Sequence, residues 1–232
     1  MQTGISLDAS RLCQPGNVKI GKLVHTRRMP ELHEEVRFHD LIVTSVIGRA
    51  FLAGRQRLVM IELGSYWAYY SLIFAKLVAE AKLHAVSIMV EPSPHKLHCG
   101  MRNFATNGFC SEDRVQARWL RAMICAPDAE KMTGYGGLMT DETSPVCTTI
   151  PNILHSFDVV KVEVLLADIQ GAELEALRSA NLSRIHHVWV GTHSINIHQQ
   201  CKELLLSSGF MIEYEVGLIR SDGYIHAFNP SF

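Results

Sequence analysis

The stretch that most constrains this chain runs from Leu58 to Ser71, LVMIELGSYWAYYS. Its four apolar residues at 58–61 predict a buried strand, because the run is too short for a core helix. A strand that ends in acid-x-Gly and turns directly into a helix leaves main-chain N–H groups facing a crevice. Gly64 would let a ligand approach the main chain, and Glu62 would place a carboxylate beside it. The alternative for this stretch is a strand–turn–helix corner with a solvated Glu62.

Composition narrows the class of protein. A length of 232 residues suits one large α/β domain, or one domain with an extension. The 47% of hydrophobic residues is enough for a core, and the 19% of charged residues argues against global disorder. A net charge of −1 gives no electrostatic case for general binding to nucleic acid or to an anionic membrane. We therefore expect a globular protein with neither partner.

The cysteines and the apolar windows suggest a cellular location. Six scattered cysteines without a CxxC motif predict reduced, mostly packed thiols, namely Cys13, Cys99, Cys110, Cys125, Cys147 and Cys201. The first 21 residues hold no continuous apolar core of the kind that a secretory signal has. The most apolar windows carry charged residues, so we expect no transmembrane span. The expected location is cytoplasmic.

Periodicity along the chain predicts the architecture. A helical pattern begins at Pro30, so residues 1–55 are expected to form an N-terminal helical extension or lid before a domain at 56–232. After the first strand, further strands are predicted at 85–90, 115–124, 162–167, 187–191, 210–216 and 224–228, with a loop at 127–149. Strands that alternate with helices and close with a hairpin imply an α/β fold. The expected sheet is doubly wound, mostly parallel and seven-stranded, with an antiparallel C-terminal hairpin.

Polar residues follow four of the predicted strands, and they are Glu62, Glu91, Asp168 and His193. The carboxyl ends of the strands form the ligand crevice in open α/β sheets. Glu91, with Pro92 ending its strand, stands where an acid grips ribose hydroxyls in dinucleotide-type crevices. The four side chains are therefore expected at one edge of the sheet, around one nucleoside.

Three motifs resemble those of the FkbM family of class I S-adenosylmethionine-dependent methyltransferases. They are IELGSYWAYYSL at 61–72, VEPSP at 90–94 and VLLADIQGAELEAL at 164–177. Their order and spacing agree with the family. The resemblance implies a Rossmann-like fold with S-adenosylmethionine as the cofactor.

The chain departs from the family pattern at three positions. Glu62 stands where the family usually has Asp, and Ala68 where it has a second glycine. Gln170 replaces the commoner acid between Asp168 and Gly171. The first two changes would tighten the cofactor loop.

The resemblance also implies how a cofactor would be held. Gly64 and Ser65 would pass beneath its methionine part, and Glu62 would lie near its amino group. Glu91 would accept hydrogen bonds from both ribose hydroxyls. Tyr66 and Trp67 would either shield the sulfonium or pack in the core. The full set of implied cofactor-binding residues is Glu62, Gly64, Ser65, Tyr66, Glu91, Pro92, Ser93, Arg121, Ala122 and Asp168, with Arg121 and Ala122 flanking the adenine.

Asp168 and His193 are the candidates for catalysis. Methyl transfer is an in-line displacement, so positioning is the main task, and an oxygen acceptor also benefits from a base. Asp168 would orient the acceptor or help to bind a divalent cation such as Mg²⁺, and His193 would take the proton or join Asp168 as a ligand. The alternatives are a helix cap for Asp168 and a structural role for His193. Glu173 is interpreted as a first-turn partner of the helix dipole.

The expected function is S-adenosylmethionine-dependent O-methylation of a small molecule, such as a sugar or a glycosylated or polyketide-like natural product. A nicotinamide-dependent oxidoreductase would need G-x-G-x-x-G, of which only Gly64 is present. A non-catalytic binding or scaffold protein is the other alternative, supported by Ala68 and Glu62. No HxxxH motif or His/Cys cluster predicts a structural zinc, and His186 and His187 are expected to be structural or exposed. The sequence sets no oligomeric state.

Overall fold

The computed structural model describes residues 36–109, 114–125, 145–219 and 222–232. Most of the predicted extension and most of the predicted loop at 127–149 lie outside these ranges. Within the extension, residues 36–40 are helical and lead into a π-helix, η3 (Leu41–Ile47), and then α2 (Gly48–Leu52). The division of the chain at residue 55 stays a prediction.

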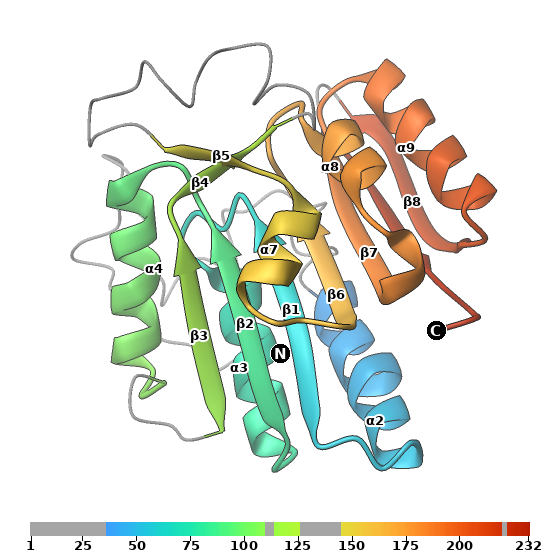
Figure 1. Cartoon of the computed structure of the whole chain (residues 1–232). Helices are drawn as coiled ribbons and strands as arrows, with labels where there is room; N and C mark the ends of the chain where they lie inside the picture. Colours follow the sequence, from blue (N-terminus) through green and yellow to red (C-terminus); the bar gives the residue numbers. More distant parts are fainter. Residues whose placement is uncertain (1–35, 110–113, 126–144, 220–221) are drawn as a thin grey trace.

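Seven strands form one sheet in the order β3-β2-β1-β6-β7-β9-β8 (Figure 1). Their bounds are β1 (Arg57–Leu63), β2 (His84–Val90), β3 (Val115–Leu120), β6 (Val162–Ala167), β7 (Ile185–Thr192), β8 (Met211–Ile219) and β9 (Asp222–Phe228). Strands β3, β2, β1, β6 and β7 pair in parallel, whereas β9 pairs antiparallel with both β7 and β8. The predicted mostly parallel sheet with an antiparallel C-terminal hairpin is confirmed.

The predicted strand at 115–124 is wrong in one respect, because it is broken at Arg121. Strand β3 ends at Leu120, and β4 (Ala122–Ile124) pairs in parallel with β5 (Val146–Thr148) in a separate sheet. That small sheet lies above the carboxyl ends of the main strands in Figure 1. The sequence analysis did not predict β5 or the helix α7 (Ile150–Ser156) after it. A three-residue strand is too short to show a periodicity.

Helices cover both faces of the sheet (Figure 1). The remaining ones are α3 (Tyr69–Glu80), α4 (Pro94–Thr106), α8 (Glu173–Ser179), the short 3₁₀ helix η4 (Leu182–Arg184) and α9 (Ile195–Ser207). On β1, Leu58 and Met60 join the core of α3 and η3, and Val59 and Ile61 join the core of α7, α8 and α9. Side chains alternate between the faces of a strand, so Glu62 is directed toward α3.

The N-terminal helical segment packs on the same core as the sheet. Phe38 is fully buried, and its ring lies 5.7 Å from that of Trp189 on β7 and 4.9 Å from that of Tyr70 on α3. Burying aromatic side chains of this size stabilises a fold by about 2–3 kcal/mol each. Residues 36–52 are therefore anchored on the sheet.

The expectation of reduced cysteines is wrong for three of the four cysteines that the structure describes. Cys125 and Cys147 form a disulfide between the ends of β4 and β5, with Cα atoms 5.7 Å apart. Cys99 is disulfide-bonded as well, whereas Cys201 is a buried free thiol. The sequence carried no signal for the first bond, because the pairing of β4 with β5 brings the two cysteines together. Disulfides are typical of oxidising compartments, so the cysteines give no support to the expected cytoplasmic location.

Candidate active site

A cavity of about 810 Å³ opens at the carboxyl ends of β1, β2 and β6, and β4 forms a further wall. Glu62 and Glu91 both line it, so the two carboxyl groups lie at the same edge of the sheet, as predicted. The predicted site residues that line the cavity are Glu62, Gly64, Ser65, Tyr66, Glu91, Pro92, Ala122 and Asp168. Ser93, Arg121 and His193 do not line it.

Glu62 is almost completely buried at the end of β1, with 2% of its surface exposed. Its Oε2 accepts a hydrogen bond from the main-chain N–H of Ser71, at 3.1 Å, in the first turns of α3. Burial raises the pKa of Glu62 to about 8, and this main-chain hydrogen bond only partly offsets the effect. The side chain is therefore a neutral acid at neutral pH while no cation lies beside it.

Gly64 makes the corner after β1 at a φ of +74°, and its N–H donates to the carbonyl of Val90 at 2.9 Å. A Cβ at this position would lie 2.0 Å from the main-chain carbonyl oxygen of Asp168. The structural reason for glycine is thus the neighbouring main chain after β6, and the ligand that the sequence suggested is not needed to explain it. The corner of β1 and the end of β6 are in direct main-chain contact.

Glu91, which is 4% exposed, fixes the loop after Gly64. Its Oε2 accepts from the N–H of Tyr66 at 3.1 Å, and its Oε1 accepts from the N–H of Ser93 at 2.9 Å. A carboxylate has about four lone-pair positions, so both oxygens keep capacity for further donors. Lys96 covers the Tyr66 ring, with Nζ 4.5 Å from the ring centroid.

The turn into α3 has a strained main chain. Tyr66 and Ala68 adopt φ values of +48° and +59°, and Ala68 is the residue that precedes the helix. A left-handed conformation in a residue other than glycine costs about 1–2 kcal/mol, which explains why the family has glycine where this chain has Ala68.

The side chains on this turn also carry polar atoms that make no hydrogen bond within the described part of the chain. Ser65 Oγ and Trp67 Nε1 are buried and have no hydrogen-bond partner among the described residues.

Ser93 and Arg121 lie outside the cavity wall for structural reasons. Ser93 is the N-cap of α4, and its hydroxyl accepts from the N–H of Lys96 at 3.4 Å. Arg121 occupies the break between β3 and β4, and the wall there is formed by Ala122, Met123 and Ile124 instead. The predicted adenine-flanking position therefore fits Ala122 better than Arg121.

Asp168, His193 and Glu173 form a cluster where β6 and β7 end. His193 Nε2 lies 3.2 Å from Oδ1 of Asp168, and its Nδ1 lies 2.9 Å from Oε1 of Glu173. The Asp168 side chain is 51% exposed, that of His193 18% and that of Glu173 fully buried. Asp168 does not cap α8, because the residue before that helix is Ala172. The helix-cap alternative for Asp168 is therefore wrong.

The two carboxylates set the protonation state of His193. The hydrogen bond to Asp168 raises the pKa of His193 to about 9, because this bond and the negative charges of Asp168 and Glu173 together outweigh the effect of partial burial. The Gln170 amide nitrogen, placed 2.8 Å from the same His193 Nε2, would need a neutral ring as acceptor. The Gln170 amide nitrogen also donates to Asp168 Oδ1, at 3.1 Å, and that hydrogen bond accounts for its position. Two carboxylates outweigh one amide dipole, so we assign an imidazolium. A protonated His193 cannot take a proton from an acceptor.

Glu173 is the residue that the sequence analysis underestimated. Its carboxylate accepts from the N–H groups of Gly171, at 3.0 Å, and Ile169, at 3.2 Å, as a partner of a helix N-terminus does. It also holds His193, which the sequence did not indicate. The only feature of the sequence that could have indicated this contact is the position of Glu173, five residues after Asp168 and across the glycine turn. Lys96 and Gln170 also line the cavity and were likewise not assigned to cofactor binding.

Comparison with solved structures shows the same fold in methyltransferases. The METTL16 methyltransferase domain is 14% identical, with a TM-score of 0.56, over 100% of this chain and 75% of that one. The human methyltransferase 10 domain containing protein is 14% identical, with a TM-score of 0.54, over 100% of this chain and 90% of that one. TrmK of M. capricolum, solved with S-adenosyl-homocysteine, is 11% identical, with a TM-score of 0.46, over 75% of this chain and 62% of that one.

The family comparison is more specific than the structural one. No curated protein matches the chain significantly. Among the described residues, no helix is long and apolar enough to cross a bilayer. The family described as "Methyltransferase FkbM domain" matches residues 54–224, which is well over half of the chain. This match covers all three motifs around the cavity, and the chain thus belongs to the FkbM family of S-adenosylmethionine-dependent methyltransferases.

Proposed function

We propose that this protein transfers a methyl group from S-adenosylmethionine to a hydroxyl group of a small molecule, with Asp168 as the base. The observation that carries the proposal is the position of Asp168. Its half-exposed carboxylate lines the cavity and is held in place from behind by His193. The family match and the fold support methyl transfer itself, and the choice of an oxygen acceptor rests on this carboxylate.

The cavity wall suits S-adenosylmethionine. Ser65 Oγ and Trp67 Nε1 are buried polar atoms in that wall without a partner among the described residues, as a site built for a ligand would have. Glu91 would accept from the ribose hydroxyls, and Glu62 would pair with the amino group. Ala122 and Ile124 would pack beside the adenine. When bound, the cofactor supplies the methyl group and a positively charged sulfur.

Asp168 and His193 then divide the chemistry between them. Asp168 accepts the hydrogen bond of the acceptor hydroxyl and takes its proton as the oxygen–methyl bond forms. The imidazolium of His193 fixes the Asp168 carboxylate, and Glu173 fixes the ring from its other side. His193 is accordingly a positioning residue in this proposal.

The Mg²⁺ that the sequence suggested is a separate expectation. Asp168, Glu173 and His193 each offer one atom within 4.8 Å of the others, so the group could hold a cation. Mg²⁺ prefers oxygen ligands in octahedral geometry, and His193 supplies a nitrogen that two carboxylates keep protonated. No step of the proposed reaction involves a metal.

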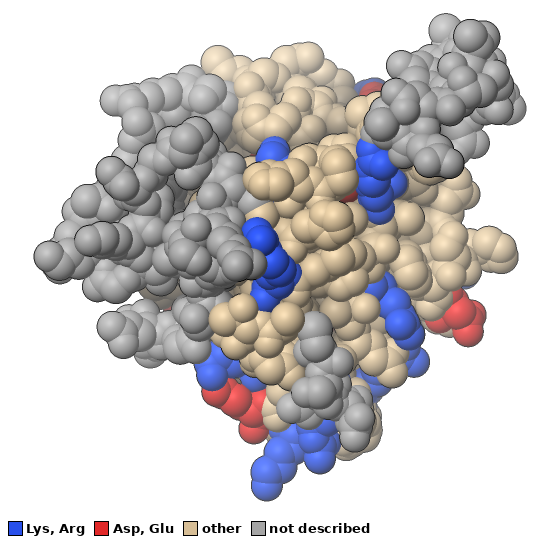
Figure 2. Space-filling view, turned by 90° about the vertical axis from the view of Figure 1, so that its left-hand side faces the viewer, with Lys and Arg blue, Asp and Glu red and all other residues tan. Residues whose placement is uncertain are grey.

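A small acceptor is favoured over a nucleic acid by the charges around the site. The Glu91 carboxylate lies in the cavity wall, and it would repel a phosphate chain. Figure 2 shows the side of α4, where Lys and Arg side chains are separated by uncharged ones on the described surface. The oxidoreductase alternative is weaker because the turn after β1 carries only Gly64 of the G-x-G-x-x-G motif that holds the pyrophosphate of a nicotinamide cofactor.

Two measurements test the proposal. Calorimetry should show binding of S-adenosylmethionine and S-adenosylhomocysteine, and absence of both at millimolar concentration would refute the cofactor assignment. Transfer of a labelled methyl group is then screened over sugars and hydroxylated small molecules. With the acceptor found, Asp168→Asn should lower kcat by about 10²–10⁴-fold and leave cofactor affinity unchanged.

The control for Asp168→Asn is Glu175→Gln, which removes an exposed carboxylate of α8 that pairs with Arg178. This control should keep full activity. A fully active Asp168→Asn variant would refute the role of Asp168, and cofactor binding without any transfer would favour the scaffold alternative.

A further inference from the structure

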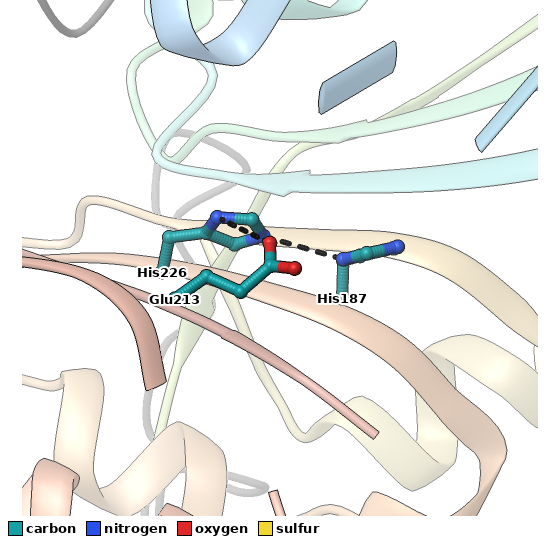
Figure 3. Close-up of side chains that lie close together, drawn as sticks. All are labelled: His187, Glu213 and His226. Carbon is teal, nitrogen blue, oxygen red and sulfur yellow. Dashed lines mark hydrogen bonds and ion pairs between the residues drawn. The ribbon is translucent and has the colours of Figure 1, made fainter. Parts of the chain in front are cut away.

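A second group of metal-ligating side chains lies outside the cavity, on the antiparallel part of the sheet. It consists of His187 on β7, Glu213 on β8 and His226 on β9 (Figure 3). His187 Nδ1 lies 3.2 Å from His226 Nε2, and His226 Nδ1 lies 3.4 Å from Oε2 of Glu213. One ligand atom from each residue lies within 4.8 Å of those of the other two. None of the three lines the methyltransferase cavity.

The strand register explains why these residues meet. On the paired strands β7 and β9, Trp189 is opposite His226 and His187 is opposite Phe228, so the two histidines are diagonal neighbours. The register of β8 against β9 shifts between Ile212 and Tyr214, which leaves Glu213 as the extra residue of a β-bulge. A bulge re-aims its side chain, and Figure 3 shows Glu213 beside the His226 ring.

Both imidazoles can offer ring nitrogens to a metal ion. His187 and His226 are buried, with 1% and 5% of their surface exposed. An imidazole binds a metal through the lone pair of one ring nitrogen. Glu213 contributes the negative charge that a cation needs, and its side chain is 42% exposed. A metal ion can reach the group from that side.

We propose that His187, Glu213 and His226 form a zinc site. Two imidazoles and one carboxylate are ligands that Zn²⁺ takes, usually with a fourth position for water. With Zn–N bonds of about 2.0–2.1 Å in a tetrahedron, two ligand nitrogens lie about 3.3 Å apart. The observed 3.2 Å between the two rings agrees with this value. The Glu213 carboxylate lies at the other ring nitrogen of His226, Nδ1, so this exposed side chain has to rotate toward Nε2 to complete the set.

The site would link three strands at the C-terminal edge. Strand β9 lies between β7 and β8, so one ion would connect all three through their side chains. We therefore assign the ion a role in stabilising this edge. The site is independent of the proposed methyl transfer, because it uses other residues on other strands.

Zinc binding by matched variants tests the assignment. The metal-free full chain is titrated with Zn²⁺ against a chromophoric chelator, and the wild type should bind one equivalent tightly. Glu213→Gln should weaken this binding by on the order of a hundredfold. The matched control is Glu215→Gln, two residues along the same strand, where the side chain contacts His198 and Lys202 instead. This control should bind like the wild type.

Two further readouts keep the test decisive. Zinc should raise the Tm of the wild type and of Glu215→Gln, and leave that of Glu213→Gln unchanged. X-ray absorption of the one-to-one complex should show two imidazoles and oxygen at about 2.0–2.1 Å. No tight binding by the wild type, or equal binding by Glu213→Gln, would overturn the proposal and leave the group as a hydrogen-bonded chain. Loss of binding in His193→Gln with retention in Glu213→Gln would also overturn it, and would assign the ion to the other cluster.

Discussion

Replacing Glu62 by Gln should stabilise the cofactor-free protein at alkaline pH. A glutamate carboxyl in water ordinarily has a pKa of 4.5, and burial raises the pKa of Glu62 to about 8 in the folded protein. Each unit of pKa corresponds to about 1.36 kcal/mol, so the ionised side chain would destabilise the folded state by roughly 5 kcal/mol above both values. The folded state holds its proton more tightly than the unfolded chain does. The contribution of Glu62 to stability is therefore fully present below a pH of about 4.5 and is lost as the pH rises through about 8.

The assay is urea unfolding of the wild type and of Glu62→Gln across this pH window. Near a pH of about 5 the neutral acid resembles the amide, so the two proteins should differ little. Near a pH of about 9 the variant should be more stable by several kcal/mol. A difference in unfolding free energy that does not change with pH would refute the assigned burial of an ionisable Glu62.

The same substitution should change how cofactor affinity depends on pH. A positively charged ligand group beside Glu62 favours the ionised carboxylate, so binding to the wild type should release a proton below a pH of about 8. Affinity should then rise by up to about tenfold for each unit of pH, and Glu62→Gln should lose this rise. The control is Glu163→Gln, because Glu163 is also a buried acid on the neighbouring strand but pairs with Arg55 away from the cavity. It should keep the pH dependence of the wild type.

Four other substitutions have expected outcomes that follow from the structure. Gly64→Ala should destabilise the fold by more than about 3 kcal/mol in urea unfolding and lower cofactor affinity, because the new Cβ would overlap the Asp168 carbonyl. The control is Gly54→Ala, which has open space around it and a φ of the same sign, and it should cost about 1 kcal/mol. Equal effects of the two would contradict the close approach. Ala68→Gly should raise stability by about 0.5–1 kcal/mol through release of the left-handed conformation, whereas Ala75→Gly inside α3 should lower it. A destabilised Ala68→Gly would mean that the lost methyl packing outweighs the strain. The charged His193 stabilises the folded protein fully below a pH of about 6.5, and this stabilisation disappears as the pH rises through about 9. The difference in unfolding free energy between the wild type and His193→Gln, measured in urea, should therefore shrink over that range. A difference that stays constant with pH would argue against the ion pair. The double variant Cys125→Ala/Cys147→Ala should lose about 3 kcal/mol of stability, since the bond closes a loop of 22 residues. Unchanged stability, together with alkylation of both Cys125 and Cys147 in the unfolded, unreduced wild type, would argue that no bond forms there.

The sheet and the convergence of the two carboxylates could be predicted from the sequence because both depend on local patterns. Each parallel strand is a short apolar run, and most are followed by a polar residue at the carboxyl end. Once the strands are parallel, their ends must share one edge, and Glu62 and Glu91 meet there without any knowledge of side-chain contacts. The seven-stranded sheet followed from the same reasoning.

The details of the site could not be predicted because they depend on contacts between distant segments. The sequence could not show that Glu173 joins Asp168 beside His193, or that the two carboxylates raise the pKa of that histidine. It could not show that Gly64 faces the Asp168 carbonyl. The disulfide at β4 and β5 and the group of His187, Glu213 and His226 likewise arise from strand register, which no spacing along the chain encodes.

The contact between the Gly64 corner and the Asp168 carbonyl has a consequence for how acceptor specificity can change. In the proposed reaction, the corner belongs to the methyl-donor side of the cavity, and Asp168 belongs to the acceptor side. Because the two touch through main-chain atoms, the separation between methyl donor and proton acceptor is set by the scaffold and is insensitive to most side-chain replacements. Substitutions at Met123, Ile169 or Gln170 in the surrounding wall could therefore redirect the protein toward other alcohols while the reacting distance stays constant.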